Sequence, residues 1–136
     1  MRKEIEKLLQ SVQKPARYAG GELNSVMKDK SKVALRYAFC FPDTYEIGMS
    51  HLGMKILYGV ANAREDTWCE RVFAPADDME ALMRANGEPL FALESGDPIK
   101  DFDMIGFTMQ YELSYTNILN MLDLAGVPLR AGDRSR

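Results

Sequence analysis

A nearly continuous apolar run, which stops at a proline and leads into a helical pattern, most constrains the fold of this chain. The run covers residues 32–41, KVALRYAFCF. A strand that is apolar on both sides is typical of a parallel sheet with helices on both faces. Beyond the next loop, a helix is expected with Ser50 as its N-cap. The apolar positions of this helix are Leu52, Ile56, Val60 and Ala61. The succession of strand, loop and helix predicts an α/β fold.

The same order of strand, loop and helix repeats along the chain. Further strands are expected at residues 69–74, 89–93 and 104–109. After the strand at 69–74, a helix is expected to begin at the capping-box pattern of Asp77 with Glu80 and to end at Gly87. After the strand at 104–109, a helix is expected with Ser114 or Thr116 as its N-cap and Gly126 as its stop. The chain therefore consists mostly of alternating strands and helices.

Alternating strands and helices with short connections imply right-handed crossovers and the spatial strand order 3-2-1-4. We therefore expect a Rossmann-like α/β fold with an open, mostly parallel sheet and helices on both faces. Residues 127–136 could start another strand but could not complete a further strand and helix. The fold is accordingly expected to be truncated at the C-terminus, with exposed sheet edges that favour a homodimer.

The N-terminal region carries a different pattern from the rest of the chain. A short amphipathic helix is expected over residues 2–13, ended by Pro15, and residues 16–32 read as an irregular arm. We place the boundary near Ser31. This gives an N-terminal helix and arm at residues 1–31 and a Rossmann-like domain at residues 32–136.

Length and charge narrow the class of protein. A chain of 136 residues suits one domain, and its net charge of −3 without runs of like charge lacks the basic surface of a nucleic-acid binder. No apolar run approaches the roughly 18 residues of a membrane helix, and the charged N-terminus lacks a signal core. A cytoplasmic protein is expected. Only Cys40 and Cys69 are present, which predicts two buried free thiols rather than a cluster or zinc site.

Two loops are expected to meet where ligands bind in open α/β sheets, beyond the carboxyl ends of the strands. Residues 41–53 include glycines that allow a close backbone approach and a helix start that favours an anion. Residues 110–117 carry tyrosines that suit a flat ligand or a partner surface. The candidate binding residues are Pro42, Asp43, Tyr45, Glu46, Gly48, Met49, Ser50, His51, Gly53, Gln110, Tyr111, Glu112, Ser114 and Tyr115.

Each catalytic interpretation of these loops has a structural alternative. His51, the only histidine, could be a base or metal ligand, or a helix-start residue that bonds the backbone. Ser50 could be a nucleophile or a cap, but no G-x-S-x-G surrounds it. Asp43 and Glu46 could be an acid–base pair or solvated loop carboxylates. Since no hydrolytic set is complete, we expect no catalysis by the chain alone.

The chain resembles the N-terminal region of bacterial radical S-adenosylmethionine (SAM) proteins of the iron–sulfur oxidoreductase type, which carry a cobalamin-binding-like domain ahead of the catalytic barrel. The resemblance rests on PARYAGGELN at residues 15–24, FPDTYEIGMSHLGMKILY at 41–58, CERVFAP at 69–75 and GFTMQYELSYTNILNMLDLAGVPLR at 106–130. It implies that a downstream C-x-x-x-C-x-x-C segment binds the iron–sulfur cluster, with SAM, in the parent protein. That barrel would be the partner of this chain.

The resemblance also implies a cobalamin site, with one departure. Cobalamin domains of the D-x-H-x-x-G kind use the histidine as an axial ligand, but here Met49 replaces the aspartate and Gly53 follows His51 after two positions. Two hypotheses follow. The loops hold cobalamin over the active site of the parent enzyme, or they form an interaction module whose contacts with the barrel or a substrate carrier include Tyr45, Tyr111 and Tyr115. A stand-alone hydrolase or flavin protein would fit the fold, but the sequence lacks the residues that either would need.

Overall fold

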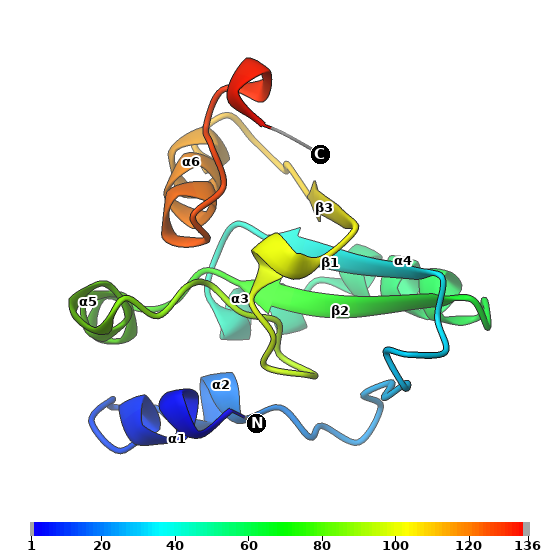
Figure 1. Ribbon diagram of the computed structural model, residues 1–136, viewed down its shortest axis with the longest axis horizontal. Helices are drawn as coiled ribbons and strands as arrows, with labels where there is room; N and C mark the ends of the chain where they lie inside the picture. The colour runs from blue at the N-terminus through cyan, green and yellow to red at the C-terminus, as the bar shows by residue number, and fades with distance from the viewer. Residues whose placement is uncertain (1, 135–136) are drawn as a thin grey trace.

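The computed structural model, which describes residues 2–134, contains a three-stranded sheet in which every strand is parallel to its neighbour (Figure 1). The strands are β1 (Leu35–Phe41), β2 (Thr67–Phe73) and β3 (Met104–Phe107), in the spatial order β2-β1-β3. The central β1 is buried over most of its length, as its apolar run predicts, and β2 is buried over all of it although it contains Thr67, Glu70 and Arg71. The open parallel α/β architecture is thus confirmed.

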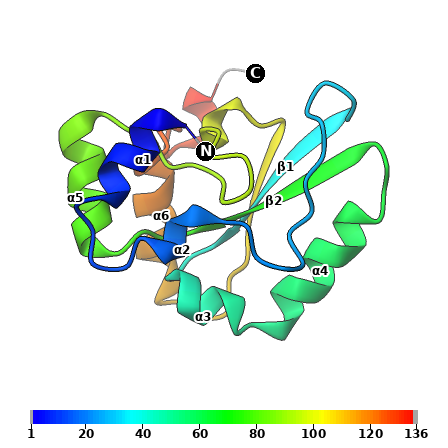
Figure 2. The ribbon, with the colours of Figure 1, turned by 90° about the horizontal axis from the view of Figure 1, so that it is seen from below.

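Helices cover both faces of this sheet (Figure 2). The helices α3 (Tyr45–Met49) and α4 (Leu52–Asn62) lie on one side, and α1 (Lys3–Leu9), α5 (Asp77–Asn86) and α6 (Ser114–Leu124) lie on the other. Along β1, side chains alternate between the two sides, so that Phe39 faces α4 while Cys40 faces α5 and α6. We call these the α4 face and the α5 face.

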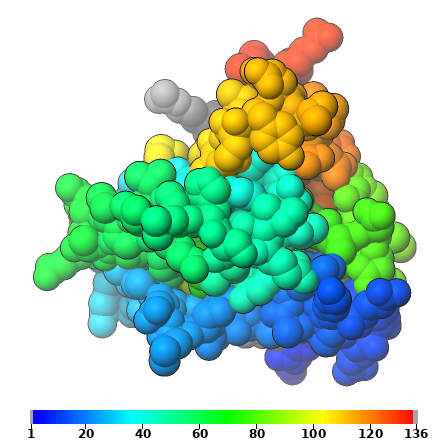
Figure 3. Space-filling view, turned by 180° about the vertical axis from the view of Figure 1, so that it is seen from behind, coloured from blue at the N-terminus to red at the C-terminus, as the bar shows by residue number. Residues whose placement is uncertain are grey.

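An N-terminal arm joins the first helices to the sheet. After α1 the chain forms a second short helix, α2 (Ala16–Ala19), within the stretch expected to be irregular, and residues 20–34 then run along the α4 face. Figure 3 shows this arm in blue beneath the green surface of α4. The backbone of Val26 accepts from the Trp68 indole at 2.9 Å and donates to the Tyr58 hydroxyl at 2.7 Å. A domain boundary near Ser31 remains a prediction, with contacts that cross it.

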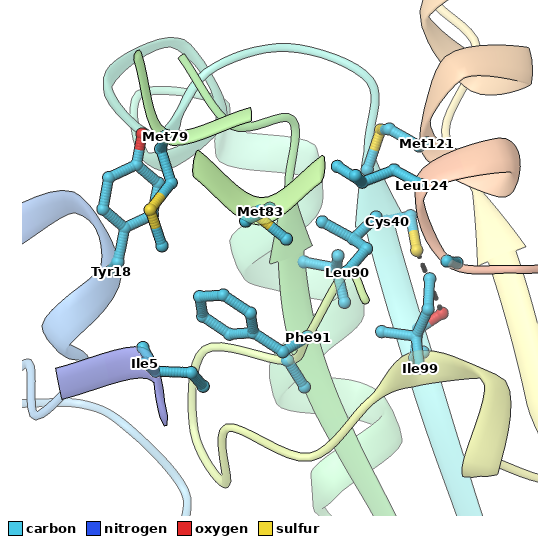
Figure 4. Close-up of a cluster of buried hydrophobic side chains, with 14 of the residues drawn as sticks. Ile5, Tyr18, Cys40, Met79, Met83, Leu90, Phe91, Ile99, Met121 and Leu124 are labelled. Carbon is cyan, nitrogen blue, oxygen red and sulfur yellow. Dashed lines mark hydrogen bonds between the residues drawn. The ribbon is translucent and has the colours of Figure 1, made fainter. Parts of the chain in front are cut away.

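The core of the α5 face is built largely from methionines and aliphatic side chains (Figure 4). Met79 and Met83 of α5 and Met121 of α6 are fully buried, and Cys40 lies among them on β1. Ile5 brings α1 into the same cluster. The unbranched methionine side chain fills irregular gaps between elements, which suits a core shared by three helices and a sheet.

The expected third strand at residues 89–93 does not form. The segment has only an isolated antiparallel bridge between Phe91 and Pro98. Leu93 begins a ladder on β2 by donating from its amide to the Arg71 carbonyl at 2.8 Å, but the Glu94 carboxylate then accepts the Arg71 amide at 2.7 Å. Because a side chain occupies the position of the next ladder bond, the pairing stops, and the expected order 3-2-1-4 was wrong by one strand.

The first helix after β1 also differs from its prediction. The chain forms α3 directly after the strand, and the Ser50 hydroxyl donates back to the Glu46 carbonyl at 2.7 Å instead of capping α4. His51 is the N-cap of α4, since its Nδ1 accepts the Met54 amide at 3.2 Å. The N-cap at Ser50 was therefore wrong by one residue.

Of the other predicted helix ends, one is confirmed and two differ in the structure. Gly87 closes α5 in the left-handed region, with a φ of 66°, and this prediction is confirmed. The expected side-chain caps of α5 and α6 are absent, because Ala76 and Leu113 occupy the N-cap positions. After α6, the described residues form a turn and a short 3-10 helix, η2 (Ala131–Asp133), where a strand start was expected.

Candidate binding surface

The structure brings the two predicted loops together at one end of the sheet. Residues 41–53 lead from β1 through α3 into α4, and residues 108–113 lead from β3 into α6. The side-chain amide of Asn117 donates to the carbonyl of Pro42 at 2.9 Å and ties the two segments to each other. This edge lies at the carboxyl ends of the parallel strands, where side chains from different elements converge.

The carboxylates of the first loop serve the backbone and the N-terminal helices. Asp43 accepts the Thr44 amide at 2.8 Å through its side chain. Glu46 pairs with Arg17 of α2 at 2.8 Å, and this hydrogen bond lowers the pKa of Glu46. Tyr45 donates to the Glu22 carboxylate of the arm at 2.9 Å. The structure does not combine these groups into an acid–base pair.

The glycines of the first loop act through packing. A Cβ placed on Gly48 would lie 2.2 Å from the Phe73 ring, so only glycine lets α3 approach the sheet this closely. A Cβ on Gly53 would meet the His51 ring at 3.0 Å. The close approach that the sequence suggested for a ligand is thus used for the protein's own side chains.

The geometry of His51 bears on cobalt ligation. Its Nδ1 accepts a backbone hydrogen bond, so the proton of the neutral ring sits on Nε2. A protonated ring nitrogen is a donor and has no lone pair for a metal. The ring also packs against Phe41, with centroids 5.3 Å apart. The residue fits the role of a helix cap, and it does not fit that of an axial ligand.

The second loop presents large side chains to solvent. Tyr111 and Tyr115 are 51% and 53% exposed, and Leu113 between them is 78% exposed. Gln110 and Glu112 are exposed as well. Ser114 is buried at the start of α6, so it is removed from the surface that its neighbours form.

Sequence periodicity misassigned the apolar side of α4. Leu52, Ile56 and Val60 are 69%, 55% and 64% exposed, whereas Met54 and Tyr58 are the buried residues of this helix. Nearly every position of α4 is apolar, so the spacing alone could not show which row faces the sheet. Figure 3 shows α3 and α4 and the loop after β3 on the same face of the molecule.

Metal-binding groups do not gather in the described part of the chain. Within residues 2–134, no three His, Cys, Asp or Glu side chains lie together in a way that could hold a metal ion. Cys40 and Cys69 are free and buried, as predicted, and burial raises the pKa of both thiols, of Cys69 to about 12. The residues present therefore do not fit an iron–sulfur cluster.

Comparison with known families decides what kind of domain this is. A family model described as radical SAM proteins, N-terminal, matches residues 53–136, which is well over half of the chain. The chain belongs to this family. Membership of the radical SAM N-terminal family implies an accessory domain whose parent protein contains a catalytic domain, an iron–sulfur cluster and SAM. The match includes α4 from its second residue onward and the second loop, but not residues 41–52 of the first loop.

The other comparisons add no radical SAM relative. Neither the curated proteins nor the solved structures contain a match to this chain. No helix within residues 2–134 combines the length and the hydropathy that a membrane crossing requires.

Proposed function

We propose that this chain is a non-catalytic module that docks onto the catalytic domain of its radical SAM parent through the loop after β3. The observation that carries this proposal is the exposure of Leu113 at 78%, with Tyr111 and Tyr115 on either side of it. Leu119, which lies on α6 one turn after Tyr115, is 47% exposed. We call these four residues the docking surface. Aromatic residues with a polar edge are enriched in protein interfaces, and adjoining exposed apolar groups mark interaction sites.

The engagement of the other polar groups supports a non-catalytic role. Ser50 donates to a helix carbonyl and His51 caps a helix. Glu46 is held by Arg17. A nucleophile and a base must lie within hydrogen-bond reach of each other, and these groups instead bond to separate structural partners.

The proposal is tested in the whole radical SAM protein by limited proteolysis. Leu113→Ser should release this domain several-fold faster, because a polar residue at the centre of an apolar contact weakens docking. Met27→Ser on the arm is the matched control, since Met27 is 62% exposed and lies outside the docking surface. Equal release rates for the two variants and the unchanged protein would refute the proposal.

We propose cobalamin as a second candidate for the same edge of the sheet. The observation that favours it is the Asn117–Pro42 hydrogen bond, which joins both loops into one rim beyond β1 and β3. Cobalamin would be held there by loop contacts, with no ligand from His51. When bound in a radical SAM parent, it would supply cobalt chemistry to the catalytic domain.

A colour test separates the two candidates. The protein is mixed with hydroxocobalamin and passed through a gel-filtration column, and the visible spectrum of the protein peak is recorded. Retained pigment that survives His51→Asn supports binding by the loops. A colourless peak at high micromolar protein leaves docking as the remaining function.

We further propose that the parent protein is cytoplasmic. The two free thiols support this, because disulfides are rare in that compartment and free cysteines are kept reduced there. Imaging of the tagged parent protein tests this proposal, and a signal confined to the cell envelope would contradict it.

A further inference from the structure

A cavity lies on the α4 face, apart from the docking surface. It is open to solvent on one side and is lined by residues 22–24 and 26 of the arm, the end of α3, one side of α4 and Arg71 of β2. Its volume is about 460 Å³, within the range of about 300–1,000 Å³ that small-molecule sites occupy. None of the helix-capping or packing roles described above requires this space.

The floor of the cavity is a buried arginine. The side chain of Arg71 is 8% exposed, and its guanidinium lies 4.8 Å from the centre of the Tyr58 ring. Its Nε donates to Glu94 at 2.6 Å, and its Nη2 donates to Glu22 at 3.0 Å. Nη1 has a poorer partner, the Met49 sulfur at 3.2 Å, and a thioether is a weak acceptor. Of the nitrogens of this buried guanidinium, Nη1 is therefore the one without a strong acceptor at the cavity.

Two further polar side chains at the cavity have no partner among the described residues. Within residues 2–134, the Lys55 ammonium and the side-chain amide of Asn24 make no hydrogen bond or salt bridge. Glu22 is fully engaged, since it accepts from Ser25, Tyr45 and Arg71. Burial opposes ionisation of Glu22, but these hydrogen bonds and the charge of Arg71 lower its pKa. Among the residues that line it, the cavity thus offers an unpaired ammonium, an unpaired carboxamide and no free carboxylate.

The walls of the cavity are mostly apolar. Met54 and Tyr58 line its inner side, and Leu23, which is 98% exposed, lies at the arm side. Gly59 contributes no side chain, and a Cβ built on it would meet nothing within 4 Å. Apolar walls with a few convergent polar groups are the usual composition of a ligand site.

We propose that this cavity binds a small amphipathic anion, with a carboxylate or sulfonate head on an aromatic or aliphatic body. The head pairs with Lys55, whose ammonium has no partner within residues 2–134, whereas the Glu22 and Glu94 carboxylates are both held by Arg71. Arg71 Nη1 adds a hydrogen bond to the head. The body lies against Met54 and Tyr58, where burial of apolar surface stabilises it.

Anilinonaphthalene sulfonate, an aromatic anion whose fluorescence rises in apolar sites, is the probe for this proposal. Titration of the 136-residue chain should show one equivalent bound. Gly59→Leu should weaken binding at least about tenfold, because the new side chain fills the cavity from a helical position that accepts leucine. Lys55→Gln should weaken binding of the sulfonate several-fold and leave binding of the uncharged N-phenylnaphthylamine unchanged.

Val60→Ser is the matched control on the next residue of α4, which is 64% exposed and lies outside the cavity. It should leave the affinity unchanged. Three results would overturn the proposal: no stoichiometric binding, unchanged binding by Gly59→Leu, or equal weakening by Val60→Ser, which would place the probe on the outer surface. Circular dichroism melting checks that each variant is folded, and Lys55→Gln removes the charge without filling the cavity.

Discussion

Asn117 on α6 and Pro42 at the end of β1 are 75 residues apart in the chain, yet the amide of the first donates to the carbonyl of the second at 2.9 Å. This is the hydrogen bond that joins the two loops at the carboxyl end of the sheet. A proline carbonyl has no partner within a ladder at this point, because the strand has already ended. The bond therefore sets the position of α6, and with it the docking surface, relative to β1.

Removal of this bond should destabilise the domain modestly. Asn117→Ala is expected to lower the free energy of unfolding by about 0.5–1.5 kcal/mol, the usual net contribution of one hydrogen bond. Urea unfolding followed by circular dichroism measures the change. Asn24→Ala is the control, since the Asn24 side chain makes no hydrogen bond within residues 2–134. Equal stability of the two variants would mean that the loops are positioned by other contacts.

Two glycines in neighbouring helices should respond to alanine in opposite directions. Gly48→Ala should cost about 1–3 kcal/mol, because its Cβ would overlap the Phe73 ring. Gly59→Ala should stabilise α4 by about 0.5–1 kcal/mol, because its Cβ meets open space and alanine favours a helix. Urea midpoints of the two variants measure both effects. A neutral Gly48→Ala would show that α3 can move away from the sheet.

His51 should tolerate one substitution and resist another. His51→Ala should lower the free energy of unfolding by about 0.5–2 kcal/mol, because the Met54 amide loses its acceptor. His51→Asn should retain most of the stability, since asparagine is a good N-cap. Thermal melting compares the two. If asparagine were as harmful as alanine, the role of the ring would lie in its packing on Phe41 and not in capping.

The pair between Arg36 and Asp97 should make stability depend on acid pH. Burial opposes ionisation of Asp97, but hydrogen bonds from Lys30 and Arg36 lower its pKa below the ordinary 3.8. A lowered pKa in the folded state gives stability that is complete above the unfolded pKa and is lost as the pH falls through the folded pKa. The melting temperature of Asp97→Asn should therefore lie below that of the unchanged chain at about pH 6 and approach it near about pH 2.5. A constant difference across this range would contradict the assignment.

The strands that were predicted from sequence are those whose signal is local. β1 is a nearly continuous apolar run that ends before Pro42, β2 ends near Pro75, and Gly87 has the left-handed conformation that closes a helix. The strand expected at residues 89–93 failed because a side chain, that of Glu94, took the hydrogen bond that the next backbone group would have made. Local composition does not reveal such a competition.

The candidate surface was predicted only in outline. Loop positions follow from strand order, so the meeting of residues 41–53 and 110–117 could be expected from topology. The exposure of Leu52, Ile56 and Val60 depends on which side of a mostly apolar helix, α4, faces the sheet, and the capping role of His51 depends on where that helix begins. The cavity beside Arg71 depends on bonds to Glu22 and Glu94, which lie 49 and 23 residues away. Spacing along the chain carries no information on contacts of this kind.

Lys28 of the arm forms hydrogen bonds with residues that come much later in the sequence. The Lys28 ammonium donates to the carbonyls of Asn62, Arg64 and Thr67, at 2.9, 2.6 and 2.5 Å. These acceptors lie 34 to 39 residues after the lysine, from the last residue of α4 to the first residue of β2. The lysine therefore cannot complete these bonds, and so cannot fasten the arm to the α4 face, until the chain has been made as far as Thr67.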